Sequence, residues 1–292
     1  MADTPGIDYL VGKRIWSESV YADCVTADGA AGLMVRLCRY PTEKIAWLWA
    51  FAFLPDKIYG YNDHYLPCTE EVTEVEKADI SYEQRQGASA VFHRKGPRDN
   101  PDGATVSLEV RAHQAPDVPH GQGSVPLNIE MQLKPYRRPW RLNRYRSEWV
   151  AEVEAIFWAD KSRFEVKGFG HWHEQHQKAP RFMVPFTYIS LRGKDLALIA
   201  SSTEGDDRGH VISGAEPIKI NEIEIDPPAD QRAISLTLKD ESKLAGTIIT
   251  VHRYFVPIYN RRRPGTLVTA QIGGYHLSGC VTGLSINDWL ID

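Results

Sequence analysis

The sequence predicts an all-β protein built from two antiparallel β units that pack directly against each other and contain little helix. Short β-type segments recur about every eight to twelve residues and are separated by turn residues, which is typical of sandwiches and barrels. The 292 residues are 42% hydrophobic and 25% charged, enough for a large core and about two domains. Segments before and after residue 160 are similar in number, with no low-complexity linker between them. We therefore expect units at 8–162 and 163–292.

Strands of the first half are marked by apolar or alternating segments that end at turn residues. The residues Gly29-Ala30-Ala31-Gly32 predict a hairpin, and Pro55-Asp56 ends an aromatic segment at 45–54. The clearest period-two alternation is at 125–134, where every second residue is apolar. The expected strands are 21–26, 33–40, 45–54, 88–95, 104–113, 125–134, 150–158 and 163–177.

The second half repeats this pattern. Turn sequences at 192–195 and 204–207 separate its β-type segments. The period of 3.6 residues that marks an amphipathic helix is rare, and only 68–86 and 143–155 are compatible with a helical turn or short helix. The expected strands are 182–191, 196–202, 210–212, 218–226, 233–240, 245–257 and 266–272.

Composition and charge exclude several classes of protein. A net charge of -4 gives no electrostatic footprint for nucleic acid. The longest apolar segment, 45–54, is too short for a membrane helix, and the N-terminal residues lack a signal-peptide pattern. We expect a soluble cytoplasmic protein with no membrane span, and the sequence carries no signal for an oligomeric state. The cysteines form no CxxC pair, so they predict neither a zinc ribbon nor a disulfide framework; they are Cys24, Cys38, Cys68 and Cys280.

The segment Gly168–Gln177, here called the central segment, holds three of the ten histidines. Side chains alternate between the faces of a strand. One face therefore carries His171, His173, Gln175 and Gln177, and the other carries Trp172, Glu174 and His176. Burying unpaired polar groups costs roughly 2–7 kcal/mol, so a polar strand in a sheet indicates a ligand. The alternative is a solvated edge strand, against which Trp172 and the flanking Phe169 and Phe182 argue.

Four segments resemble the tandem lipocalin-like proteins related to carotenoid 1,2-hydratase (hydroxyneurosporene synthase) and the AttH-like proteins. They are Trp16-Ser17-Glu18-Ser19-Val20-Tyr21, Trp47-Leu48-Trp49-Ala50-Phe51, Gly168-Phe169-Gly170-His171-Trp172-His173-Glu174 and Phe186-Thr187-Tyr188. Relatives often carry a Gly-x-Gly and then an Asp-His-Ser-Trp-Gly type of segment, where this chain has His-Trp-His-Glu-Gln-His. The resemblance spans most of the chain. The different residues in this one segment put in doubt whether the chain shares the chemistry of those relatives.

The resemblance implies two lipocalin-like β barrels side by side, with a ligand site at a barrel mouth or in the cleft between domains. In the hydratases a carboxylic acid protonates an isolated double bond, and water captures the cation. Other relatives are thought to act in isoprenoid or polyketide tailoring. The same resemblance implies a small hydrophobic substrate for this chain.

The central segment supplies the residues expected to carry acid/base chemistry. Histidine both takes and gives protons near neutral pH, and apolar neighbours can raise the pKa of a carboxylic acid. Arg181 is expected either to hold a substrate carboxylate or to form a surface ion pair. The candidate catalytic residues are His171, His173, Glu174 and His176, and the candidate substrate-binding residues are Trp172, Gln175, Arg181, Tyr188, Asp63 and His64.

The pair Asp63–His64 is a second candidate site, because it places a carboxylate beside an imidazole. Adjacent strand residues point in opposite directions, so the two act together only in a turn, which Asn62-Asp63 favours. The alternative is a capped polar loop with tyrosines on the core.

A metal site is the remaining alternative. The spacing of His171 and His173 lets two imidazoles converge, as in cupins, but Glu174 faces away and no distant histidine partner is evident. We therefore expect neither a metal nor another cofactor. The leading hypothesis is a cofactor-independent lyase, hydratase, isomerase or cyclase, and the alternatives are a non-catalytic carrier of a hydrophobic ligand and an HxH metal enzyme of cupin type.

Overall fold

The computed structural model describes residues 14–178, 186–203, 206–214, 216–258 and 261–284. Strands make up nearly all of its regular structure, and the only helix in this part of the chain is the 3-10 turn η2, Pro41–Glu43. The strands are β1 (Trp16–Val25), β2 (Gly32–Tyr40), β3 (Ile45–Leu54), β4 (Lys57–Pro67), β5 (Ile80–Gln84), β6 (Ser89–Lys95), β7 (Gly103–Gln114), β8 (Val125–Pro135), β9 (Trp140–Asn143), β10 (Arg146–Ala159), β11 (Ser162–Lys178), β12 (Phe186–Arg192), β13 (Ala197–Thr203), β14 (Asp206–Ile212), β15 (Ile218–Ile225), β16 (Gln231–Leu238), β17 (Lys243–Ile258), β18 (Arg261–Ile272) and β19 (Tyr275–Leu284).

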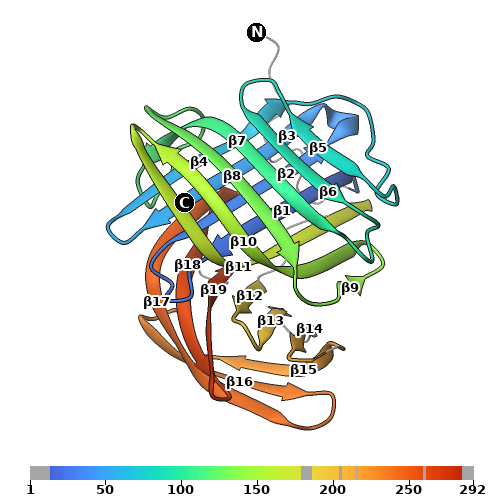
Figure 1. The fold of residues 1–292 in the computed structure, drawn as a ribbon, viewed down its shortest axis with the longest axis vertical. Coiled ribbons are helices and arrows are strands. Elements are labelled where there is room, and N and C mark those ends of the chain that lie inside the picture. Colours follow the sequence, from blue (N-terminus) through green and yellow to red (C-terminus); the bar gives the residue numbers. More distant parts are fainter. Residues whose placement is uncertain (1–13, 179–185, 204–205, 215, 259–260, 285–292) are drawn as a thin grey trace.

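The first unit is one large antiparallel sheet. Its strand order is β4-β3-β2-β1-β11-β10-β8-β7-β6-β5, with β9 paired to β10. A short ladder, Tyr59 with Gln114 and Gly60 with His113, joins β4 to β7 and brings eight strands into a ring. The strands β6 and β5 continue the sheet beyond β7 and lie outside this ring. Figure 1 shows the first unit in its upper part, above the smaller second unit.

The second unit is a closed antiparallel barrel of the eight strands β12 to β19, drawn in the lower part of Figure 1. Its core is aliphatic, because alternate residues of each strand point inward; Ile234, Leu236 and Leu238 of β16 are examples. The predicted all-β fold of two lipocalin-like units is confirmed.

The two units share an apolar interface. Tyr21, Trp49 and Phe51 of the first unit form one buried cluster with Tyr254 and other residues of β17 to β19. The opposite face of β1 to β3 lies in the core of the first unit, so these strands are buried on both sides. This explains the unbroken apolar sequence of 45–54, since a strand buried on both faces needs no polar alternation.

Several sequence-based expectations differ from the structure. Residues 163–178 form most of β11, which pairs with β1 and β10, so the first sheet extends past residue 162 to Lys178. No helix forms at 68–86 or 143–155; the first holds β5 and the second holds most of β10. Four strands were missed: β4, β5, β9 and β19. In β4 the Asn62-Asp63 pair indicated a turn, yet pairing with β3 and a bridge from Asn62 to Gly121 keep the segment extended.

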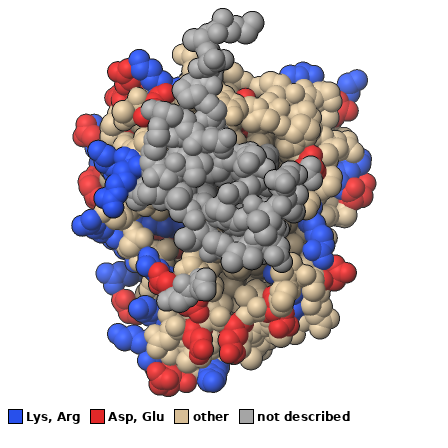
Figure 2. All heavy atoms as spheres, turned by 180° about the vertical axis from the view of Figure 1, so that it is seen from behind, with Lys and Arg blue, Asp and Glu red and all other residues tan. Residues whose placement is uncertain are grey.

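The surface is that of an ordinary globular protein. On the face shown in Figure 2, acidic and basic side chains are interspersed around the periphery. Among the described residues, no helix is long and apolar enough to cross a membrane.

Candidate functional site

A cleft of about 340 Å³ lies between the two units and is lined by residues of both. Its walls come from the outward faces of β1 to β3, β10 and β11 on one side and from β12, β13 and β17 to β19 on the other. Aromatic rings and arginines dominate the lining; the residues are Tyr21, Met34, Arg36, Trp49, Arg146, His173, Gln175, Gln177, Phe186, Tyr188, Ser201, Thr203, Tyr254, Val256, Arg263, Cys280 and Thr282.

The central segment lies within β11, and its side chains alternate as the sequence predicts. His173, Gln175 and Gln177 line the cleft, and Gln175 donates a hydrogen bond to Gln177 (2.9 Å). His171 is on the same strand face, but it is fully buried behind the cleft wall. This face of the strand therefore meets the second unit, while the other face meets the core of the first.

Glu174, Trp172 and His176 face the interior of the first unit, away from the cleft. Glu174 accepts hydrogen bonds from Arg94 (2.7 Å) and from the Trp172 indole (2.9 Å), and His176 contacts the Tyr82 hydroxyl (2.7 Å). The four candidate catalytic residues therefore do not share one cavity, in agreement with the two strand faces that the sequence predicts. The physical reason is the period of two in the strand, which separates neighbours by the full thickness of the sheet.

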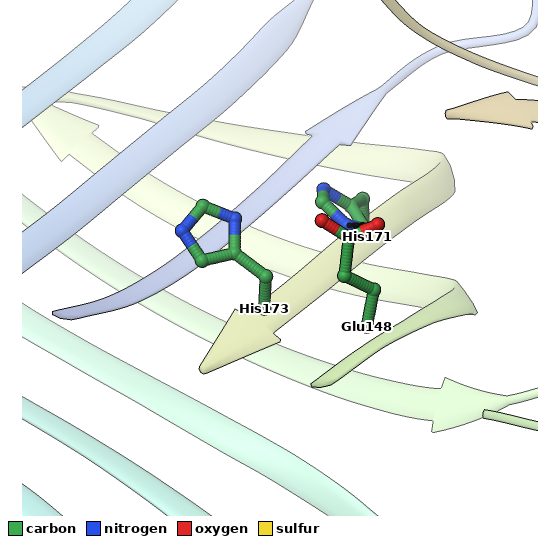
Figure 3. A group of neighbouring side chains, drawn as sticks. All are labelled: Glu148, His171 and His173. Atoms are coloured by element: carbon green, nitrogen blue, oxygen red, sulfur yellow. Dashed lines mark ion pairs between the residues drawn. The ribbon is translucent and has the colours of Figure 1, made fainter. Parts of the chain in front are cut away.

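The carboxylate that does meet the two histidines is Glu148 of β10, which stands opposite His173 in the strand register. One carboxylate oxygen accepts a hydrogen bond from Arg146. The other lies 3.9 Å from His171 Nε2, too far for a hydrogen bond. Ligand atoms of Glu148, His171 and His173 all lie within 4.8 Å of one another. Figure 3 shows the three side chains beside one another. We call these three residues the buried triad.

Burial controls the protonation of this triad. Desolvation, with help from the Arg192 and Arg146 cations, lowers the pKa of His171 well below its ordinary value, so the ring is neutral near pH 7. Desolvation raises the pKa of Glu148, and the Arg146 cation opposes the rise. Neither His171 ring nitrogen nor Glu148 Oε2 has a hydrogen-bond partner among the described residues. Buried atoms without a partner also occur elsewhere in the described chain, so what distinguishes this position is that two imidazoles and a carboxylate meet in one place.

Arg146 fixes the orientation of the groups at the cleft wall. Its Nη2 donates to the Tyr188 hydroxyl (2.8 Å) and, over a longer distance of 3.4 Å, to His173 Nδ1. A guanidinium has no acceptor, so neutral His173 accepts at Nδ1 and carries its proton on Nε2. The Tyr188 hydroxyl accepts from Arg146 and keeps its own proton, because burial raises its pKa well above the ordinary value.

Two imidazoles and one carboxylate are also a ligand set that iron or zinc accepts. The surrounding charge argues against a divalent cation: the Arg146 guanidinium is bonded to Glu148 and lies 3.4 Å from His173 Nδ1. Arg192, held by Asp23 at 2.9 Å, adds a second cation near His171. The donor set fits a metal, and the electrostatics favour a proton-transfer site.

Asp63 and His64 lie in strand β4, so the expected turn was wrong. A register shift opposite Ala46 to Leu48 marks a bulge at this place. His64 Nε2 accepts a hydrogen bond from the Trp49 indole (2.8 Å), and Trp49 lines the cleft. Burial lowers the pKa of His64 to about 3, and the charges of His120 and Arg36 make smaller contributions in the same direction. Asp63 pairs with His120 at 3.3 Å instead, so the two residues do not act as a unit.

Of the other predicted binding residues, Gln175 and Tyr188 line the cleft, whereas Trp172 stacks on Trp149 in the core of the first unit (centroids 5.7 Å apart). Arg181 lies outside the described residues. Sequence reasoning missed Arg146 and Glu148, because residues 143–155 also allowed a helix. The signal that this strand begins before residue 150 was an alternation in which Arg146, Glu148, Glu152 and Glu154 occupy one face, interrupted only by Val150.

No protein-family model and no curated protein matches the sequence. Among solved structures, the fold is similar to that of CghA (9% identity, 93% of this chain and 88% of that chain, TM-score 0.59). It is also similar to a candidate AttH protein of Nitrosomonas europaea (11%, 93% and 92%, TM-score 0.58) and to kievitone hydratase of Nectria haematococca (7%, 95% and 90%, TM-score 0.50). The resemblance seen in the sequence is thus confirmed for the fold.

Proposed function

We propose that the protein is a cofactor-independent lyase or isomerase, of hydratase or cyclase type, that acts by acid/base catalysis on a small hydrophobic molecule in the cleft between the units. The observation that carries this proposal is the buried triad, whose His173 lines an aromatic cleft. Elongated or ring-shaped apolar substrates suit such walls, which offer few but well-placed polar groups.

The groups have distinct chemical roles in this proposal. Glu148 is the carboxyl group that exchanges a proton, because its raised pKa brings it closer to the operating pH. The proton reaches the substrate through His173, the member of the triad that lines the cleft, and His171 is the neutral neighbour of both groups. His173 Nε2–H and the Tyr188 hydroxyl are the donors that polarise a substrate oxygen, while Arg146 holds both in place.

Kievitone hydratase supports the hydratase form of the proposal through its name, and its similarity to this chain extends to the fold alone. The principal alternative is a carrier, which needs the cleft but not the ionisable groups. The aromatic lining suits both functions, whereas a carrier has no use for a carboxylate and two imidazoles gathered at the wall of its cleft.

The proposal is tested by incubating the protein in D2O with a panel of small isoprenoid, polyketide and aromatic compounds that carry an alkene or an enone. Mass spectrometry then detects the gain of one water, or deuterium at carbon in a product of unchanged formula. Turnover that disappears in Glu148→Gln supports the proposal. Tight binding of panel members without any conversion or exchange would instead identify a carrier.

A further inference from the structure

The barrel of the second unit has a pocket of its own at one end, with a volume of about 360 Å³. The pocket is formed by the start of β12, the β15–β16 turn and parts of β17, β18 and β19. Apolar walls come from residues such as Ile225, Pro227, Tyr254 and Val281. Its volume falls within the lower part of the range for small-molecule sites, about 300–1,000 Å³.

The unusual member of this pocket is Arg232 of β16. It alternates with Ile234, Leu236 and Leu238, which are core residues, so its side chain points into the barrel. It is only 5% exposed. Its Nη2 donates to the Thr266 hydroxyl (3.3 Å), which in turn donates to the Val281 carbonyl, and its Nε has no hydrogen-bond partner among the described residues.

Within the described ranges, no carboxylate forms an ion pair with Arg232. Asp226 lines the same pocket, but its carboxylate accepts the Ala233 amide (2.9 Å), and Asp230 pairs with Arg253 (2.6 Å). Burial and the neighbouring Arg253 cation lower the pKa of Arg232. An arginine nevertheless stays charged near neutral pH. The positive charge of Arg232 is therefore buried without a carboxylate to balance it.

Three other arginines with similar burial are each compensated by a buried carboxylate. Arg39, Arg94 and Arg192 each face a buried carboxylate at 2.7 to 2.9 Å. An uncompensated buried charge is costly, and proteins retain one where a bound group completes the pair.

We propose that this barrel mouth is a second binding site, separate from the cleft, for a small apolar molecule that carries a carboxylate. The carboxylate lies on the guanidinium of Arg232 and on the Thr266 hydroxyl, and the apolar body lies against the proline, tyrosine and valine walls. This site does not depend on the function proposed for the cleft.

The test compares 2-naphthoate with 2-naphthamide, which has the same shape without the charge, by titration calorimetry. The acid should bind wild-type protein at least about tenfold more tightly, since hydrogen bonds to charged groups are the stronger ones. Arg232→Met should remove that preference while the protein stays folded, as checked by its melting temperature. Arg208→Met is the matched control, because Arg208 is an exposed barrel arginine paired with Asp206.

Equal affinity of wild-type protein for the acid and the amide would overturn the proposal without need of any variant. So would a preference that survives Arg232→Met and is lost in Arg146→Met, because the acid would then lie in the cleft. Arg232→Lys should keep part of the preference for the acid over the amide, because lysine keeps the positive charge but not the shape of the guanidinium.

Discussion

Two buried glutamates on adjacent strands give a matched test of which face of the sheet carries chemistry. Glu148 faces the cleft side and pairs with Arg146, and Glu174 faces the first core and pairs with Arg94. Both glutamate side chains are at most 1% exposed. Replacing either with glutamine removes one charge from a buried pair and keeps the shape of the side chain.

For Glu174→Gln we expect a loss of stability. Removing one partner of a buried ion pair leaves the other charge uncompensated, at a cost of about 3–5 kcal/mol. For a domain of about 150–250 residues this lowers the melting temperature by about 6–20 °C, since each kcal/mol corresponds to about 2–4 °C. Turnover below that temperature should stay within a few fold of wild type, because the side chain does not line the cleft.

For Glu148→Gln we expect a similar loss of stability together with a fall in turnover of about 10²-fold or more, the usual contribution of a positioned acid or base. The assay is turnover of any substrate from the D2O panel, measured alongside thermal unfolding. The contrary result is a Glu174→Gln protein that keeps wild-type stability but loses turnover about 10²-fold, while Glu148→Gln stays active. That result would refute this assignment and place the chemistry inside the first unit.

Elemental analysis of the purified protein should show no stoichiometric transition metal, because Arg146 already forms a hydrogen bond to the carboxylate of Glu148. One zinc, iron or manganese per chain that is lost on mutating His171 or His173 would establish the metal alternative. His173→Ala should abolish turnover and weaken ligand affinity, because His173 donates to the substrate, whereas a carrier, which does not need its ionisable groups, should keep its ligand affinity nearly unchanged. Stability should fall as pH decreases from about 6.5 toward 3, since unfolded His64 takes up a proton that the folded ring, with its pKa lowered to about 3, does not. Thermal melts of His64→Gln should show a shallower pH dependence in that window, and an identical slope would contradict the assignment.

The sequence by itself determined the strands whose patterns are local. The alternation at 125–134 gave β8 nearly to the residue, and the apolar segment at 45–54 matches β3. The same local rule separated His171 and His173 from Trp172, Glu174 and His176. Period-two alternation follows from the backbone geometry of a strand alone, so no tertiary contact was needed to predict it.

Only the tertiary structure decided which groups meet across strands. Glu148 joins the two histidines because β10 and β11 pair in a register that sets it opposite His173, and 25 positions of sequence separate the two residues. Likewise β4 stays extended through Asn62-Asp63, because β3 on one side and a bridge from Gly121 to Asn62 on the other satisfy backbone groups there and outweigh the local turn preference. Register and strand neighbours are non-local properties, fixed by the packing of the whole sheet, and the candidate site is built from them.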